Sequence, residues 1–458
     1  MRARQLAERL SAPALAVATL ALLSLMFFYP VGIVLVEAVR VDGAYSLATV
    51  VEVLRDPFYF GVFAQALDDP GVVVRSFPDY RLGLFGFTAY QALLSTVAAI
   101  ALGLPGAYVL ARFEFPGRRT IRSLTALPFV MPTILVAIGF VATFGANGVV
   151  TGALQSLGLR VESFTGTLGI IVLAHAFYDA PLIARITAAS WEGIDAEMTE
   201  TARSLGASPL RAFRDVVVPQ LLPAILTGAL LTFIFSFMSF AIVLALGGLS
   251  LATVEVWVYH RISQLDYGTA STLATMEMLF SLALTYAYLR YEARQRATGA
   301  ARPPDRIDLL GPATKRRLFA WGYAVVALVV FVVPIVSLVL ASVTGPEGVT
   351  LRNYRFLVDR QTSAYAFQVK PLTAVTNSQI AAASMVPRPA RDRIRPNTGE
   401  RTDSTDDTRW HGFPLLLQKT KRIPPNHEEI RTRSHRVCIH PPDLRPSAAN
   451  HSLCHRSN

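Results

Sequence analysis

Three ionisable residues lie inside apolar stretches of this chain, where a charged side chain is costly. His175 and Asp179 are one helical turn apart, and Glu277 stands between Met276 and Met278. A histidine and a carboxylate at this spacing could act as a general base and its orienting group. No serine or cysteine nucleophile motif and no metal-ligand helix accompanies them, which disfavours a membrane hydrolase. Two roles remain open for these three ionisable residues: lining a translocation path, and forming hydrogen bonds between helices.

A second cluster of reactive side chains lies in the last part of the chain. Its H-x-x-C pairs involve His435, Cys438, His440, His451, Cys454 and His455. Their spacing differs from the common zinc finger and zinc ribbon patterns, so we predict no metal site. Residues 387–458 also contain no apolar run able to span a membrane, and we expect the tail to be disordered. A basic interaction tail is one interpretation, and we favour a frameshifted or truncated remnant.

A polar stretch between two long apolar segments, residues 195–223, predicts two short helices. Asp195 is the expected N-cap of the first helix, and Gly206 can adopt the left-handed conformation that ends it. Ser208 followed by Pro209 is a strong signal for the start of the second helix.

Each of these two helices has an apolar face. The faces consist of Met198, Ala202 and Leu205 in the first helix, and of Leu210, Phe213 and Val217 in the second. We expect Pro219 and Pro223 to close the second helix. A pair of short helices with apolar faces and charged flanks indicates a docking element for another protein.

This stretch resembles the cytoplasmic loop of permease subunits from binding-protein-dependent ABC importers. The pattern in that family is E-A-A, three residues, G, nine residues, I-x-L-P. Both spacings are kept here, with threonine for the first alanine and valines for isoleucine and leucine. The resemblance implies a docking loop for an ATP-hydrolysing subunit, formed by Glu200, Thr201, Ala202, Gly206, Pro209, Val216, Val218 and Pro219.

Composition independently places the chain in a membrane class. Of its 458 residues, 52% are hydrophobic and only 16% are charged, which is too apolar for a typical soluble protein. The net charge of +11 comes from basic residues in loops beside apolar runs and in the tail. Such loops mark the cytoplasmic ends of membrane spans, so we expect a lipid bilayer and no nucleic acid as partner.

Seven apolar segments are long enough to cross a bilayer. They are residues 13–39, 84–111, 124–144, 167–185, 221–246, 269–289 and 320–343. The first could be a cleaved signal peptide, but it is longer than the apolar core of one, and we favour a retained span. The strongly basic loops all fall on one side, which predicts a cytoplasmic N-terminus, docking loop and linker. The expected fold is therefore an all-α polytopic bundle of about seven spans in the cytoplasmic membrane.

Part of the chain repeats. Residues 28–35 resemble 332–339, and Pro30 aligns with Pro334 at an offset of 304 that also places Ser46 on Thr350. A fixed offset across a helix and its outer loop predicts a duplicated module. The predicted domains are a first permease module with six spans (1–290), a cytoplasmic linker (291–319), the start of a truncated second module (320–378) and the tail (379–458).

The region after the docking loop narrows the family further. Residues 237–248, 252–256 and 265–267 look like the thiamine importer permease, and iron(III) importer permeases share the doubled architecture. The resemblance implies a non-enzymatic permease for thiamine or iron(III) that binds no cofactor. It also implies two copies of a cytoplasmic ATPase, which hold the ATP, and an extracytoplasmic solute-binding protein.

Two alternatives to this function are a secondary transporter or channel without an ATPase, and an inactive truncated permease. The docking pattern argues against the first, because a transporter without an ATPase has no use for it.

Overall fold

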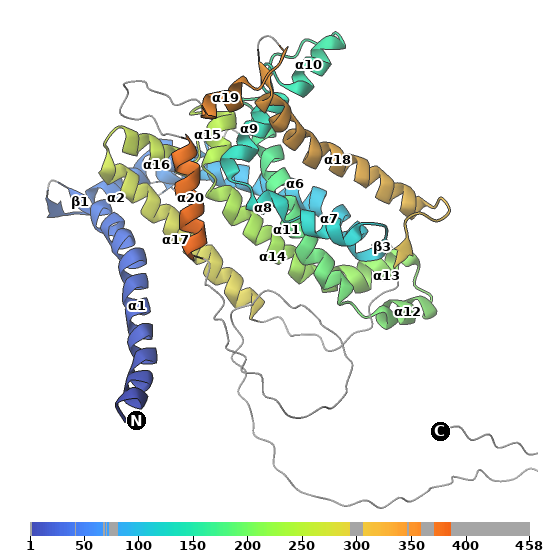
Figure 1. The fold of residues 1–458 in the computed structure, drawn as a ribbon, viewed down its shortest axis with the longest axis horizontal. Coiled ribbons are helices and arrows are strands. Elements are labelled where there is room, and N and C mark those ends of the chain that lie inside the picture. Colours follow the sequence, from blue (N-terminus) through green and yellow to red (C-terminus); the bar gives the residue numbers. More distant parts are fainter. Residues whose placement is uncertain are drawn as a thin grey trace, which may run out of the picture. The chain divides into compact units, whose positions relative to one another are not determined.

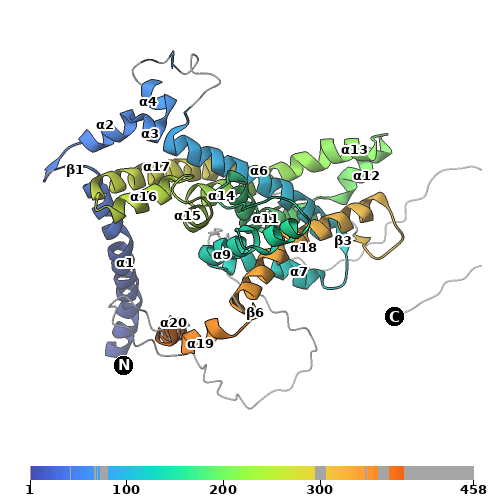
Figure 2. The same cartoon turned by 90° about the horizontal axis from the view of Figure 1, so that it is seen from above.

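The described part of the chain forms a helical bundle with seven candidate membrane spans (Figures 1 and 2). The structure is a computed structural model that describes residues 2–41, 43–66, 69, 71–72, 81–293, 306–345, 348–358 and 371–385. The candidate spans are Leu15–Ala38, Gly83–Arg112, Thr133–Ser156, Leu168–Glu192, Pro209–Phe237, Tyr267–Glu292 and Lys315–Ser342. The predicted all-α polytopic fold is confirmed.

The elements follow one another in a simple order. The first part contains α1 (Arg2–Ala38), β1 (Arg40–Val41), β2 (Ala44–Tyr45), α2 (Ala48–Arg55), α3 (Pro57–Phe60) and α4 (Val62–Ala66). Next come α6 (Gly83–Arg112), β3 (Phe113–Glu114), α7 (Arg118–Leu124), α8 (Leu127–Val130), α9 (Thr133–Phe144), α10 (Val149–Ser156) and α11 (Leu168–Glu192). They are followed by α12 (Ala196–Ser204), α13 (Pro209–Ala212), the π-helical turn η1 (Phe213–Val217), α14 (Val218–Phe237), α15 (Ala241–Gly247), α16 (Val254–Ser263) and α17 (Tyr267–Glu292). The last are β4 (Ile307–Asp308), α18 (Lys315–Ser342), β5 (Thr344–Gly345), β6 (Gly348–Val349), α19 (Arg352–Val358) and α20 (Pro371–Met385).

The centre of the bundle is the pair α6 and α11, with α14 packed against both. The two helices approach closely at Gly103, where an added Cβ would lie 2.7 Å from the Ala180 carbonyl oxygen and 3.0 Å from Ile183 Cβ. On α14, Gly228 allows a similar contact with Ile183. In a membrane the hydrophobic effect does not drive helices together, because the lipid is as apolar as the side chains. Small residues at helix crossings instead let the backbones approach closely and pack.

A second core joins α9, α11 and α15. Its buried residues include Phe140, Phe177 and Ile242, and Phe331 and Ile335 of α18 pack on them. α18 thus lies along α9 (Figures 1 and 2), whereas α1 packs on α17.

The fifth span begins earlier than the sequence suggested. We expected the second docking helix to end before Pro219 and Pro223, and the span to run over 221–246; both expectations were wrong. α13, η1 and α14 follow one another without a break, and the helix ends at Phe237. Proline is tolerated in the first turn of a helix, and the widened π turn changes the hydrogen-bond pattern just before Pro219.

Two other boundaries also differ. The third span does not start at 124, because Pro128 and Pro132 split that region into α7, α8 and α9. Residues 379–385 are helical, contrary to the prediction of a disordered tail from 379, since α20 continues to Met385 through an alanine-rich stretch that favours helix. The predicted His–Cys pairs, residues 294–305 of the linker and residues 73–80 of the external loop lie outside the described residues.

The segments that follow α1 and α18 have the same geometry. β1 and β2 pair antiparallel with Arg40 opposite Tyr45, and β5 and β6 pair with Thr344 opposite Val349, each 304 positions later. The Ser46 hydroxyl accepts a 3.1 Å hydrogen bond from the nitrogen two residues on, and the Thr350 hydroxyl does the same at 3.1 Å. Helix, hairpin and a hydroxyl-bonded turn leading into the next helix therefore recur at one offset.

We predict that Gly103→Val lowers the free energy of unfolding by about 1–3 kcal/mol, because the new side chain forces α6 and α11 apart. Unfolding of the purified chain in detergent, followed by circular dichroism, measures this. Gly169→Val is the matched control, since Gly169 lies in α11 with nothing within 4 Å of its added Cβ. Equal losses for both variants would contradict the close packing.

Candidate functional site

The polar stretch after α11 folds as a helical hairpin whose first arm is α12. The Asp195 side chain accepts a 3.1 Å hydrogen bond from the backbone of Glu197 and caps the helix, as expected. At the other end Gly206 has φ +92°. The nitrogens of Gly206 and Ala207 donate to the carbonyls of Arg203 and Ala202, each at 3.0 Å. These two bonds form a Schellman cap. The turn needs a positive φ at residue 206, a conformation that glycine adopts without strain.

The second arm starts at Ser208, whose hydroxyl accepts a 3.3 Å hydrogen bond from the nitrogen of Arg211. α13 and η1 then lead directly into α14, so the second arm of the hairpin is the beginning of a membrane span. Any displacement of the hairpin is therefore applied to the end of a continuous helix.

The hairpin exposes a set of large apolar side chains that we call the docking face: Met198, Leu205, Leu210 and Phe213. Leu205 and Leu210 are 84% and 76% exposed. Apolar side chains so exposed at the tip of a polar hairpin indicate a surface that another protein covers.

The predicted motif residues are spread over this hairpin. Glu200, Thr201, Gly206, Pro209 and Pro219 are exposed, whereas Ala202, Val216 and Val218 are half-buried. Val217, which is not among the predicted site residues, is the buried member of the motif and packs with Trp191, Ile194 and Leu221. The motif thus combines an exposed tip with a buried anchor.

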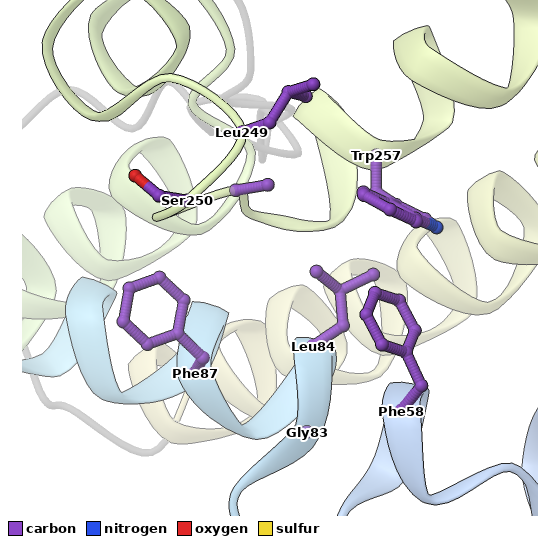
Figure 3. Close-up of a pocket in the computed structure, with 8 residues that line it drawn as sticks. Phe58, Gly83, Leu84, Phe87, Leu249, Ser250 and Trp257 are labelled. Carbon is purple, nitrogen blue, oxygen red and sulfur yellow. The ribbon is translucent and has the colours of Figure 1, made fainter.

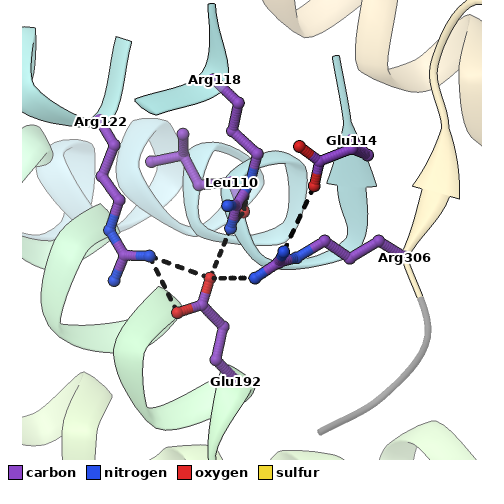
Figure 4. Close-up of polar contacts among 6 residues, drawn as sticks. All are labelled: Leu110, Glu114, Arg118, Arg122, Glu192 and Arg306. Atoms are coloured by element: carbon purple, nitrogen blue, oxygen red, sulfur yellow. Dashed lines mark hydrogen bonds and ion pairs between the residues drawn. The ribbon is translucent and has the colours of Figure 1, made fainter. Parts of the chain in front are cut away.

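A cluster of charges lies at the foot of the hairpin (Figure 4). Glu192, the last residue of α11, accepts hydrogen bonds from three guanidinium groups. Arg122 contacts both of its oxygens, at 2.9 and 3.0 Å, and Arg306 lies 3.4 Å away. The buried Arg118 donates to Glu192 and also to the carbonyl oxygen of Leu110, at 2.9 and 2.6 Å. One carboxylate thereby joins α6, α7, α11 and the segment before α18.

That segment is also held by backbone pairing. β4 pairs in parallel with β3, with Phe113 opposite Ile307, and the nitrogen of Leu309 donates to the carbonyl of Glu114 at 3.0 Å. Leu309 packs in a small core with Val109 and Phe113. The described part of the linker is therefore bound to the end of α6 beside the charge cluster.

His175 and Asp179 are both buried in α11 but have different partners. His175 Nδ1 accepts a 2.7 Å hydrogen bond from the Gln91 amide and lies 3.2 Å from the Ser95 hydroxyl, both on α6. Asp179 accepts a 3.2 Å hydrogen bond from Ser236 on α14. Among the described residues no hydrogen bond joins His175 to Asp179, so the geometry does not form the base and orienter of a hydrolase.

Several polar atoms in this layer have no hydrogen-bond partner within the described structure. They are Nε2 of His175, Oδ1 of Asp179, Oε1 of Glu277 and Oε1 of Gln91. Glu277 is 2% exposed on α17. Glu255, on the neighbouring α16, is a further half-buried carboxylate, and burial raises its pKa. Unpartnered polar atoms at membrane depth are typical of a path that opens in another conformation.

An aromatic pocket of about 220 Å³ lies at the other end of α6 from the hairpin (Figure 3). It is lined by Phe58, Gly83, Leu84, Phe87, Leu249, Ser250, Ala252 and Trp257. The rings of Phe58 and Trp257 are 4.8 Å apart, and Arg261 lies over the Trp257 ring at 5.5 Å. By the predicted topology this pocket faces the exterior.

Several of these residues were not predicted from the sequence. Gln91 and Ser95 are polar positions one turn apart in an apolar helix, a signal that could have been found. Glu192 and Arg306 are far apart in the sequence, and nothing local marks them as partners.

Known proteins with a similar sequence identify the family. The profile described as binding-protein-dependent transport system inner membrane component matches residues 99–297. A probable sulfate transport system permease protein of Nephroselmis olivacea is 32% identical over 218 residues, which cover 47% of this chain and 76% of that protein. The chain belongs to this family. It is the permease subunit of an ABC importer and a multi-pass protein of the cell membrane.

Two more proteins resemble this chain, one in sequence and one in structure. The thiamine transport system permease protein of Escherichia coli is 31% identical over 241 residues, covering 52% of this permease and 45% of that protein. Among solved structures, a chain of a bacterial alginate ABC transporter is 15% identical, with a TM-score of 0.48, covering 64% of this permease and 98% of that chain. The relatives by sequence are transport permeases and not enzymes.

We predict that Glu192→Gln lowers the free energy of unfolding of the permease by about 1–3 kcal/mol, because the buried Arg118 loses its charged partner. Thermal unfolding in detergent measures the effect. The control is Glu114→Gln, whose exposed side chain forms an ion pair at 3.3 Å with Arg306 and with no other described residue, and whose loss should cost less than about 1 kcal/mol. An equal effect of the two substitutions would show that Glu192 does not hold the cluster together.

Proposed function

We propose that the hairpin formed by α12, α13 and η1 is the surface through which this permease couples ATP hydrolysis on a partner subunit to solute uptake. The observation that carries this proposal is the combination of an exposed docking face with a second arm continuous with a membrane span. An ATPase that grips the tip moves α14 directly.

The foot of the hairpin supports the same role. Trp191 stacks on Phe213 with ring centroids 5.8 Å apart, and both contribute to the junction of α11 with η1. Val217 and Leu221 continue that contact into the membrane. Because the joint is packed, motion at the tip reaches α11 and α14 together instead of being lost in a flexible loop.

The hairpin and its connection to α14 are the basis for the partners that we propose for this permease. We propose that Glu200, exposed on α12, pairs with a basic group of the ATPase, and that ATP is bound there and not by this chain. Each permease module offers one hairpin, so two modules would engage two ATPase copies. An extracytoplasmic binding protein would deliver the solute at the opposite face, near the aromatic pocket.

We predict that Gly206→Pro abolishes ATP-driven uptake while membrane insertion persists. Proline cannot adopt φ +92° and has no N–H to donate to the Arg203 carbonyl, so the Schellman cap and the hairpin angle are lost. Uptake by cells in which the variant replaces the natural chain measures this, with the amount of inserted protein measured in the same membranes.

Gly206→Asn is the matched control, because asparagine tolerates the left-handed conformation and should retain most of the uptake. Normal uptake by the proline variant would contradict the docking role and favour a transporter without an ATPase.

We further propose that the solute is a cation and that thiamine is the first candidate, with iron(III) the other. Asp179 and Glu277 each place in the membrane layer a carboxyl oxygen that has no partner among the described residues and is available as a ligand to a cation. The aromatic pocket has room for one ring, since roughly 150 Å³ of apolar cavity holds a benzene molecule. Thiamine combines a positive charge with aromatic rings, and both features therefore have a counterpart in the permease.

We predict that Asp179→Asn reduces uptake of labelled thiamine about tenfold, which corresponds to 1.4 kcal/mol of lost attraction. Glu52→Gln, a change at an exposed position of α2, is the control and should leave uptake unchanged. Labelled sulfate is assayed in parallel, because a relative is a sulfate permease. Transport of sulfate and not thiamine would overturn the cationic assignment while leaving the docking proposal intact.

A further inference from the structure

Helix α2 has three faces with different surroundings. On one face Val53 is buried and Val50 is half-buried, and this face packs on the bundle. A second face carries Glu52 and Arg55, which are both exposed. The third face is apolar, although it is exposed in the described structure.

The apolar face consists of Leu47, Val51 and Leu54, which we call the α2 stripe. Their positions at i, i+4 and i+7 place them on one side of the helix. They are 62%, 44% and 36% exposed, respectively. Apolar surface in water is unfavourable, so a continuous stripe of this kind indicates apolar surroundings.

α2 lies at the level where membrane spans begin and end. Val53 packs with Leu84 and Leu273, which lie within the first two turns of α6 and α17. The Thr272 hydroxyl of α17 donates a 3.2 Å hydrogen bond to the carbonyl of Ala38, the last residue of α1. Three candidate spans therefore have an end in this region, which is where a bilayer would meet water (Figures 1 and 2).

α2 is fixed on the bundle at its C-terminal end. The nitrogen of Asp56 donates to the Glu52 carbonyl at 3.0 Å, and the Asp56 side chain accepts a 2.8 Å hydrogen bond from the nitrogen of Phe58. The Phe58 ring lies 4.8 Å from the Trp257 ring of α16, centroid to centroid. Because these contacts hold α2 from rolling, the direction of the α2 stripe is set by the fold.

We propose that α2 is an interfacial helix whose stripe enters the leaflet at this end of the bundle, the outer leaflet by the predicted topology. Only the short hairpin of β1 and β2 separates the stripe from the exposed apolar surface of span α1, so it continues a surface that faces lipid. A helix with one apolar and one charged face lies in the headgroup region and does not cross the bilayer. The inference does not depend on the docking hairpin or on the identity of the solute.

Fluorescence quenching of the full-length chain tests the proposal, with Cys438 and Cys454 replaced by serine. Val51→Cys places a thiol on the stripe, and Glu52→Cys, the next residue, is the matched control on the charged face. Each thiol carries an environment-sensitive fluorophore. The protein is reconstituted in nanodiscs of phosphatidylethanolamine and phosphatidylglycerol, and its emission is measured with spin-labelled phosphatidylcholine and with aqueous iodide as quenchers.

We expect the spin-labelled lipid, and not iodide, to quench the label at residue 51, at a depth of about 5–10 Å into the boundary between headgroups and acyl chains. We expect the label at residue 52 to be quenched by iodide and not by the lipid. Leu54→Cys and Arg55→Cys form a second pair with the same expected contrast, which keeps the test decisive if one variant fails to fold.

Three results would overturn the proposal. The first is equal access of iodide to both labels, whether or not an added binding protein then protects the stripe, because the stripe would face water or a protein. The second is equal quenching of both labels by the lipid, which would mean that α2 is immersed without a preferred face. The third is protection of the label at residue 51 from both quenchers, which would mean that protein and not lipid covers the stripe.

Discussion

The structure depends on a carboxylate at the end of α11. Glu192 is the acceptor for Arg118, Arg122 and Arg306, and it lies three residues before the cap that starts the hairpin. Arg118 is almost fully buried, so its charge needs a partner there, and Glu192 supplies it. The end of α6, the foot of the hairpin and the segment before α18 are thereby held as one body. Without that joint the docking face would be attached to the spans only through the chain itself and the apolar packing of Trp191, Phe213 and Val217.

Inside the membrane layer the helices are held by different means. Lipid is as apolar as the side chains, so close approach at Gly103 and Gly228 and hydrogen bonds between helices replace the hydrophobic effect. His175 binds α6 through Gln91, and Asp179 binds α14 through Ser236. The ionisable residues thus connect the three central helices, while some of their polar atoms remain without a partner. Holding the bundle together and lining a path are compatible roles for the same side chains.

The repeat shows how surroundings, and not sequence, can distinguish two similar helices. α1 and α18 are followed by hairpins of the same register and by the same hydroxyl–backbone hydrogen bond before the next helix. α18 contributes Phe331 and Ile335 to the core around α9, α11 and α15, whereas no residue in the apolar window of α1 is buried in the described structure. A helix that is apolar on all sides can serve either role, because its sequence sets membrane insertion and leaves the choice of neighbour open.

The sequence alone determined that there are about seven spans, and it determined the hairpin caps at Asp195, Gly206 and Ser208 and the repeat. Hydrophobic length and capping chemistry are each contained in a short window of residues, and the repeat needs only the comparison of two such windows. Only the tertiary structure decided that the second arm of the hairpin is the start of α14, and that His175 and Asp179 turn to different helices. It also decided that Arg306 meets Glu192, 114 residues away. Pairings of that kind depend on how whole helices pack, and the physical information for them is spread over many distant side chains.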